Sequence, residues 1–166
     1  MPEPVRQPPS AAESGANGAQ THFEKGLRAA QTGFPDQAAK AFEEAAWLDP
    51  GNAEAQFNLG TAYLSMGLFE QAIVNLSNAV KLRPDMPDAW GNRAVAHAAL
   101  GEDDRSQADL NEAVRRGGNP DGLRAVIEYV KSRRKPQGPL GLATAREIEG
   151  AHGSPLPLSQ GAGQER

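Results

Sequence analysis

Side chains that could support catalysis or metal binding are few and scattered along this sequence. His22, His97 and His152 are far apart, and no His-x-x-x-His, Glu-x-x-His or Asp-rich spacing accompanies them; we therefore predict no metal site. The sequence also lacks a Gly-x-x-x-x-Gly-Lys phosphate loop, a nucleophile elbow and cysteines, which argues against phosphate-loop and thiolate chemistry. Asp103 and Asp104 are neighbours, but we expect them in a turn between helices, where polar residues are normal. We predict a protein that is not an enzyme and needs no cofactor.

The basic residues near the end of the expected folded part are a second candidate. Lys131, Arg133 and Arg134 follow a weakly acidic body in a chain of net charge -4, and they could contact an acidic partner, a phosphate or a membrane surface. Cations also favour the C-terminal end of a helix, so a solvated helix end explains them more simply. Tyr129 stands alone among them, whereas a single-strand nucleic-acid binder would interleave several aromatic residues. We do not expect nucleic acid as the main partner.

Composition limits where the protein could act. The sequence has 166 residues with 5% aromatic residues, and none of its apolar runs approaches the roughly 18 residues of a membrane span. The proline-rich N-terminal stretch has no apolar core of the kind that secretory signals contain. We therefore expect a cytoplasmic protein without a membrane span and without a small-molecule substrate.

The elements that would position a site follow from a repeat of 34 residues. Gly33, Gly67 and Gly101 share this spacing, as do the alanines at 45, 79 and 113 and the prolines at 50 and 84. A fixed period of this length is typical of stacked copies of one small unit. Within each unit two apolar stripes of period 3.6 predict two helices, separated by a glycine turn and ended by a break. One such hairpin cannot bury both of its faces, so the copies must stack.

These columns resemble the tetratricopeptide repeat family. The second repeat matches nearly throughout, with Leu59, Gly60 and Tyr63 in its first helix and Ala72 in its second. The third repeat departs from the pattern, for example at Ser106. The resemblance implies an all-α, right-handed solenoid of stacked antiparallel helix pairs. We place repeats at 19–52, 53–86 and 87–120, followed by a capping helix at 121–134. We expect residues 1–18 and the Pro/Gly-rich residues 135–166 to be disordered tails.

The resemblance also implies a binding site, because family members bind partners on the concave face formed by the first helix of each repeat. An apolar groove of this kind suits an extended segment or an amphipathic helix. Glu54 and Asp88 would rim the groove, which favours a neutral or basic partner. The Lys and Arg residues with which some members grip a C-terminal carboxylate are replaced here, so we do not expect that ligand. The predicted groove residues are Phe23, Leu27, Glu54, Phe57, Asn58, Thr61, Leu64, Asp88 and Val95.

The function indicated by these features is a non-catalytic adaptor or scaffold that holds a protein or peptide segment in the groove. A dedicated chaperone for a secreted or assembling partner is an alternative that rests on fold-level analogy. Binding to an anionic surface or nucleic acid through Lys131, Arg133 and Arg134 is a second alternative. Self-association through the groove or the capping helix is a third.

Overall fold

The structure, a computed structural model, describes residues 11–134, with side chains from residue 15 onward. Within this range the chain forms seven α-helices and no strand, so the predicted all-α architecture is confirmed. The helices are α1 (Ala11–Gln31), α2 (Pro35–Leu48), α3 (Ala53–Ser65), α4 (Phe69–Leu82), α5 (Pro87–Ala99), α6 (Asp103–Arg115) and α7 (Pro120–Arg133).

The turn inside each helix pair depends on the repeated glycine. Gly33, Gly67 and Gly101 have φ angles of +80°, +74° and +81°, in the left-handed region that glycine enters without a steric penalty. Each glycine ends the first helix of a pair and lets the chain reverse into the second helix. The column of glycines in the sequence therefore has one local cause, repeated three times.

Side chains at the helix starts fix where the next elements begin. The Asn52 side chain accepts a hydrogen bond from the Ala55 amide at 3.0 Å and caps α3. The Asn119 side chain accepts bonds from the amides of Asp121 and Gly122 at 3.0 and 3.2 Å. Asparagine is among the preferred N-cap residues because it satisfies amides that lack an intrahelical partner. Asn119 therefore fixes the start of α7 as Asn52 fixes the start of α3.

Paired helices approach closely where a glycine faces a large side chain. A Cβ built on Gly26 would lie 2.5 Å from the Phe42 ring, and one built on Gly60 would lie 2.7 Å from Leu76 Cγ. Both large side chains are essentially fully buried. The small and large columns of the repeat are therefore complementary surfaces of one helix crossing, and a larger residue at either glycine would overpack it.

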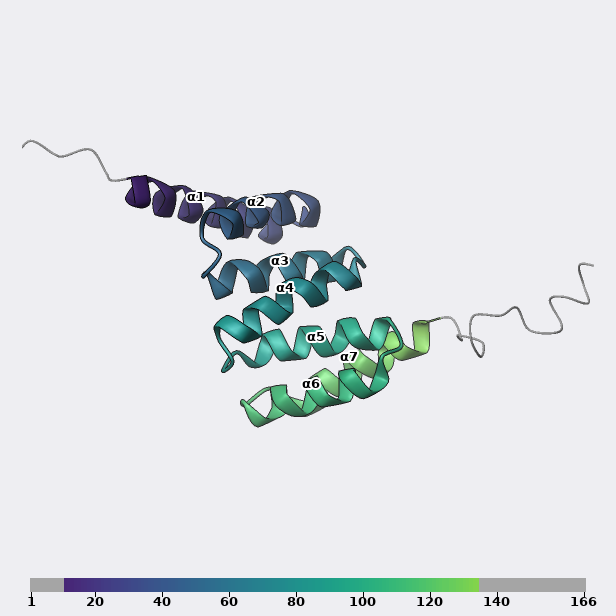
Figure 1. Cartoon of the computed structure of the whole chain (residues 1–166). Coiled ribbons are helices and arrows are strands. Elements are labelled where there is room, and N and C mark those ends of the chain that lie inside the picture. The colour runs from purple at the N-terminus through teal and green to yellow at the C-terminus, as the bar shows by residue number, and fades with distance from the viewer. Residues whose placement is uncertain (1–10, 135–166) are drawn as a thin grey trace, which may run out of the picture. The chain divides into compact units, whose positions relative to one another are not determined.

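The helix pairs are stacked in chain order (Figure 1), with α2 packed on α3 and α4 packed on α5. The last helix breaks this order. If α7 continued the stack as the first helix of a fourth repeat, it would pack on α6. Instead it packs mainly on α5 and only lightly on α6. The predicted capping helix is present, but it covers a first helix instead of the end of the array.

One predicted boundary is wrong. Residues 11–18 were expected to belong to a disordered tail, whereas α1 begins at Ala11. Alanine is the strongest helix former, and each of Gly15 and Gly18 weakens a helix by only about 1 kcal/mol, so α1 begins at Ala11. The expected tails at 1–10 and 135–166 lie outside the described residues. Among the described helices, none is long and apolar enough to cross a membrane.

Candidate protein-binding groove

The predicted groove residues of the first repeat belong largely to the core. The rings of Phe23 and Phe42 have centroids 5.7 Å apart and are tilted by 54°. Phe23 and Leu27 are half-buried and pack against the cluster around Phe42. Their hydrophobic surface therefore mainly stabilises the first helix pair and its contact with α3, and little of it faces a partner.

The apolar residues predicted for the second and third repeats are also largely covered. Phe57 is half-buried against the clusters around Val80 and Leu76. Leu64 is half-buried, and Val95 is only 8% exposed. The expectation that Val95 lines an open groove is thus wrong. Its cover comes from α7, whose position the sequence pattern did not predict.

Helix α7 occupies the face that α5 would otherwise present to a partner. Leu123, Ile127 and Val130 lie on one side of α7 and pack against a cluster that contains Val95. A Cβ on Gly91 would lie 2.7 Å from Leu123 Cδ2, so the glycine allows α7 to approach α5 closely. In the third repeat, α7 therefore occupies the face of α5 on which a partner segment was expected to bind.

A charged clamp holds the end of α7. The Arg134 guanidinium donates two hydrogen bonds to the Asp103 carboxylate, at 2.6 and 2.8 Å, and one to the Ala98 carbonyl at 3.1 Å. Hydrogen bonding from Arg134 lowers the pKa of the Asp103 carboxyl below its ordinary value. The Lys131 ammonium lies 3.9 Å from the same carboxylate. The predicted turn residue Asp103 is the first residue of α6 and anchors α7.

The predicted anionic contact is thus mostly neutralised. Arg134 and Lys131 pair with Asp103, and Lys131 also lies 3.3 Å from Glu128. Arg133 differs, because its guanidinium stacks over the Tyr129 ring at 5.3 Å, and no carboxylate in residues 11–134 forms an ion pair with it. Of the three cations predicted as an anionic contact, Arg133 is therefore the one that is exposed without an ion pair in residues 11–134.

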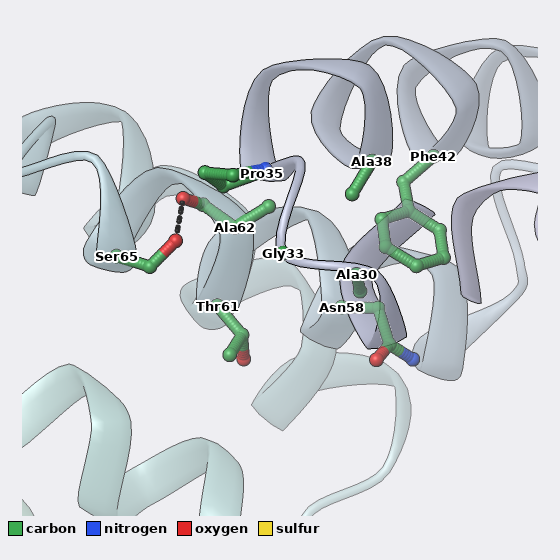
Figure 2. A pocket seen from close by; sticks show the side chains of 9 residues that line it. All are labelled: Ala30, Gly33, Pro35, Ala38, Phe42, Asn58, Thr61, Ala62 and Ser65. Carbon is green, nitrogen blue, oxygen red and sulfur yellow. Dashed lines mark hydrogen bonds between the residues drawn. The ribbon is translucent and has the colours of Figure 1, made fainter. Parts of the chain in front are cut away.

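An open hollow remains between the first two repeats (Figure 2), with a volume of about 330 Å³. We call it the first hollow. Ala30, Gly33 and Pro35 line it at the end of α1 and the start of α2, and Phe42 of α2 lines it as well. Helix α3 contributes Asn58, Thr61 and Ser65 to its lining. Two predicted groove residues, Asn58 and Thr61, therefore meet at the same cavity.

The same positions one repeat later explain why this hollow is open. Adding 34 to Ala30 and Thr61 gives Leu64 and Val95. Leu64 and Val95 are the larger, apolar residues on which α7 packs. In the first repeat the small Ala30 leaves space, and the Thr61 hydroxyl makes the wall partly polar. The sequence differences at these columns therefore separate a covered face from an open one.

Polar side chains of α3 form a strip along the wall of the first hollow, and one of them is hydrogen-bonded to α5. The Asn58 amide donates to the Glu54 carbonyl at 2.8 Å. The Thr61 hydroxyl donates to the Phe57 carbonyl at 2.9 Å and accepts from the Asn92 amide at 3.0 Å. Such fixed amide and hydroxyl groups are suited to hydrogen bonding with a peptide backbone.

The acidic rim is weaker than the sequence indicated. Glu54 pairs with Arg83 at 3.1 Å, so its charge is compensated, whereas Asp88 is exposed at the start of α5. The expectation of a neutral or basic partner depended on both carboxylates. The first hollow itself is lined by uncharged residues.

Sequence reasoning missed a buried ionic network in the third repeat. The Arg93 guanidinium donates to both oxygens of Asp109 at 2.7 Å and to the Ser77 hydroxyl at 3.0 Å. His97 Nδ1 lies 2.5 Å from a Glu102 carboxylate oxygen, and hydrogen bonding from His97 lowers the pKa of Glu102. The available signal was that Arg93 and His97 are charged or polar residues close in sequence to Ala94, which is buried. This placement indicates that they need buried polar partners.

This network is structural. Arg93 lies on α5, Asp109 on α6 and Ser77 on α4, so the contacts join the second repeat to the third. The guanidinium groups of Arg93 and Arg116 both lie over the Trp90 ring, at 4.8 and 4.6 Å from its centroid. In residues 11–134, no group of three His, Asp or Glu side chains is arranged to hold a metal ion.

Comparisons with known proteins agree with this geometry. A tetratricopeptide repeat model matches residues 23–75, and a second repeat model of the same kind matches residues 62–101. No curated protein matches the sequence. The fold is similar to that of the Arabidopsis OM64 tetratricopeptide domain, with a TM-score of 0.65 and 20% identity over 72% of this chain and 99% of that chain.

Two further similar structures contain bound peptides. One is the first tetratricopeptide domain of Spaghetti (RPAP3) bound to the HSP90 peptide SRMEEVD, with a TM-score of 0.64, 21% identity and coverage of 70% of this chain and 93% of that chain. The other is the second such domain of human RPAP3 with the HSP70 peptide SGPTIEEVD, with a TM-score of 0.63, 18% identity and coverage of 75% and 100%. At these identities the likeness establishes the fold. Together with the two repeat models, it shows that residues 23–101 contain tetratricopeptide repeats.

Proposed function

We propose that this protein is a non-catalytic adaptor that holds a short segment of a partner protein in the open part of its groove, between α1 and α3. The observation that carries this proposal is the first hollow, an apolar cavity beside the polar strip of Asn58 and Thr61. An apolar cavity takes up a side chain of the segment, and the amide and hydroxyl groups bind its backbone. Similar structures with bound peptides support this proposal.

The proposed ligand differs from the peptides in those structures. The groove positions at which some family members carry two Lys and one Arg are here occupied by Phe23, Asp88 and Asn92. Phe23 packs against the core, Asp88 is acidic and Asn92 is uncharged, so a terminal carboxylate would find no cation there. We therefore propose an internal segment of the partner as the ligand.

A matched pair of substitutions tests the proposal. Asn58 and Asn75 each donate a side-chain hydrogen bond to the carbonyl four residues earlier, at 2.8 and 2.9 Å. Both are half-buried, but Asn58 lines the first hollow and Asn75 lies on α4, outside it. Asn58→Arg and Asn75→Arg therefore make the same chemical change at two comparable helical positions, only one of which faces the groove.

The measurement is an affinity purification from the source lysate with wild type and both variants, after circular dichroism shows that all three are folded. We expect a protein recovered by wild type and by Asn75→Arg to be lost with Asn58→Arg. Equal recovery of every protein by the two variants would contradict binding in this part of the groove.

The alternatives differ in what they require of the structure. An anionic-surface binder would use Lys131, Arg133 and Arg134, of which two are paired with Asp103. A chaperone would use the same groove as an adaptor and would differ in its client, which would aggregate when expressed alone. Co-expression of the recovered partner would separate these two roles.

A further inference from the structure

The outer surface of α2 carries an exposed tryptophan beside two glutamates. Trp47 is 76% exposed, more than any other large apolar side chain among the described residues. Glu43 and Glu44 lie four and three residues before it on the same helix, and both are exposed. Side chains with this spacing are neighbours on a helix surface. None of the three lines the first hollow, so this surface is separate from the proposed groove.

The equivalent positions of the third repeat show which group lies beside such a glutamate. Two repeats later, the positions of Glu44 and Trp47 hold Glu112 and Arg115 of α6. The Arg115 guanidinium lies 2.9 Å from the Glu112 carboxylate, so α6 supplies a cation for this glutamate from its own sequence. In α2 the cation is replaced by Trp47, and the equivalent glutamate lacks that partner.

The two glutamates of α2 keep their charge. In residues 11–134, no ion pair involves a residue of α1 or α2. Lys25 and Lys40 border a hollow that Glu44 also lines, but neither pairs with it. Glu43 accepts a hydrogen bond from the Tyr63 hydroxyl. Burial and this bond raise the pKa of Tyr63 to about 12, so the hydroxyl stays neutral and fixes the carboxylate without compensating its charge.

The other of the two tryptophans shows how the chain places arginine on such a ring. The guanidinium groups of Arg93 and Arg116 lie over the Trp90 ring, and the Arg93 group also donates to both oxygens of Asp109. A ring face attracts a cation while a carboxylate binds its N–H groups. Among the described residues, no cation lies over Trp47. Its ring and the adjacent carboxylates therefore offer both parts of an arginine site without the arginine.

We propose that this surface binds a basic segment of a partner protein, with an arginine guanidinium stacked on Trp47 and bonded to Glu44, and a neighbouring cation of the segment compensating Glu43. The inference goes beyond the proposed adaptor function, because it assigns a second site, on the outer surface of α2, to a partner of different chemistry. Tryptophan and arginine are also enriched among the residues that contribute most to protein interfaces. Because the site is exposed, salt should weaken the binding.

Two indole signals allow a direct test. In a ¹H–¹⁵N spectrum of the full ¹⁵N-labelled chain, Trp47 and Trp90 each give one indole N–H signal. The probe is acetyl-Gly-Arg-Arg-Gly-amide, and the matched control carries citrulline, which has nearly the same shape and no charge, in place of both arginines. We expect the probe to shift the Trp47 signal in a saturable way. The Trp90 signal should stay in place, because its N–H donates to the Pro84 carbonyl at 2.9 Å.

The citrulline peptide should bind about fivefold more weakly than the probe, because it offers neither a cation for the ring nor a charge for the carboxylates. A probe that shifts neither indole signal, equal affinity of the two peptides, or equal shifts of both signals would overturn the inference.

Protein variants test the parts of the site through the backbone amide signals of α2. Glu44→Gln should weaken the probe by up to about fivefold, and Trp47→Leu by about two- to fivefold. Lys40→Gln removes a competing cation one turn from both glutamates and should tighten the probe about twofold. Glu70→Gln is the matched control, because Glu70 is exposed on α4 and forms no ion pair in residues 11–134. Equal weakening by Glu44→Gln and Glu70→Gln would mean general attraction to an acidic chain and would contradict the site.

A second copy of the chain is the competing occupant, because Arg133 is exposed and has no ion pair in residues 11–134. Sedimentation equilibrium tests it. A monomeric wild type supports a different partner, whereas a dimer that is lost with Trp47→Leu and with Arg133→Gln would assign the site to a second copy and overturn the proposal. The adaptor proposal can fail separately, since Asn58→Arg changes the first hollow and should leave the probe's affinity unchanged.

Discussion

Two neighbouring parts of the predicted groove face differ in whether the protein itself covers them. Between repeats two and three, α7 covers Val95 and leaves Leu64 half-buried. Between repeats one and two, the equivalent residues Thr61 and Ala30 border an open hollow of about 330 Å³. The repeat fixes where each helix runs, but the size and polarity of a few side chains decide whether a face is filled by the protein itself.

Close approach by α7 also depends on a residue that the earlier repeat lacks. Gly91 allows Leu123 to reach α5, whereas the equivalent residue of α3 is Phe57. A helix could not approach α3 as closely, because the Phe57 side chain would stand between the two backbones. The covered part of the face is therefore suited to a helix, and the open part to a thinner, extended segment.

Truncating a buried side chain with which α7 packs on α5 should have the largest effect on stability. Ile127 is 3% exposed and packs with Val95 and Ala98, so Ile127→Ala should cost about 2–5 kcal/mol of unfolding free energy. Val126 is 47% exposed on the same helix, and Val126→Ala should change stability by less than about 0.5 kcal/mol. Urea denaturation of both variants measures the difference. Equal losses would mean that α7 is not seated as described.

Replacing Gly91 by the residue that α3 carries at the equivalent position should fill the space next to α5 that Leu123 of α7 occupies. Gly91→Phe places on α5 the residue that α3 carries at Phe57, and overpacking against Leu123 should cost about 1–3 kcal/mol. We expect the amides of α7 to lose hydrogen-exchange protection while those of α3 and α4 keep theirs. Gly122→Ala is the control, because its Cβ would lie 3.6 Å from the nearest Asn119 atom, an ordinary contact. Retained protection of α7 in Gly91→Phe would refute the role assigned to the glycine.

Filling the open hollow should make the first repeat more like the second. Ala30→Leu adds the side chain found at Leu64 to a cavity bounded by Phe42 and Pro35. Cavity-filling substitutions commonly add about 0.5–2 kcal/mol, and we expect a gain in this range by thermal and urea denaturation. Thr32→Leu is a control in the α1–α2 turn, where Thr32 is exposed and outside the lining. A destabilised Ala30→Leu would show that the hollow is too narrow for the side chain.

The sequence predicted the repeated features well because they depend on neighbours in the chain. The turn glycines need a left-handed φ, and Gly60 needs to fit against Leu76; both requirements recur every 34 residues and are visible as columns. The position of α7 does not recur. It depends on contacts between α7 and the distant Gly91, Val95 and Asp103, which no periodicity records.

The errors at the predicted site have the same origin. Val95 was assigned to the groove because the resemblance places its position on the inner side of a first helix. Its burial comes from packing with Ile127 of α7, a helix outside the repeats. The first hollow was not predicted either, since a cavity arises where side chains are small relative to their surroundings, and the surroundings of Ala30 include residues of α2 and α3. Comparing columns between repeats, Ala30 with Leu64, was the signal that could have indicated it.

Breaking the charged clamp between Arg134 and Asp103 should change stability least. The clamp tests how much the ion pair contributes to holding α7 on α5. Hydrogen bonding from Arg134 lowers the pKa of Asp103 from its ordinary value of 3.8, so the folded state favours the carboxylate. The clamp's contribution to stability is therefore present above pH 3.8 and is lost as the pH falls through the lower folded pKa.

A ¹³C NMR titration of the Asp103 carboxyl carbon measures that pKa. We expect Arg134→Gln to return it toward 3.8, and Lys131→Gln, which removes an ammonium 3.9 Å away, to change it less. An unchanged pKa in Arg134→Gln would leave α7 held by its apolar side alone, and acid should then not loosen the covered face relative to the open one.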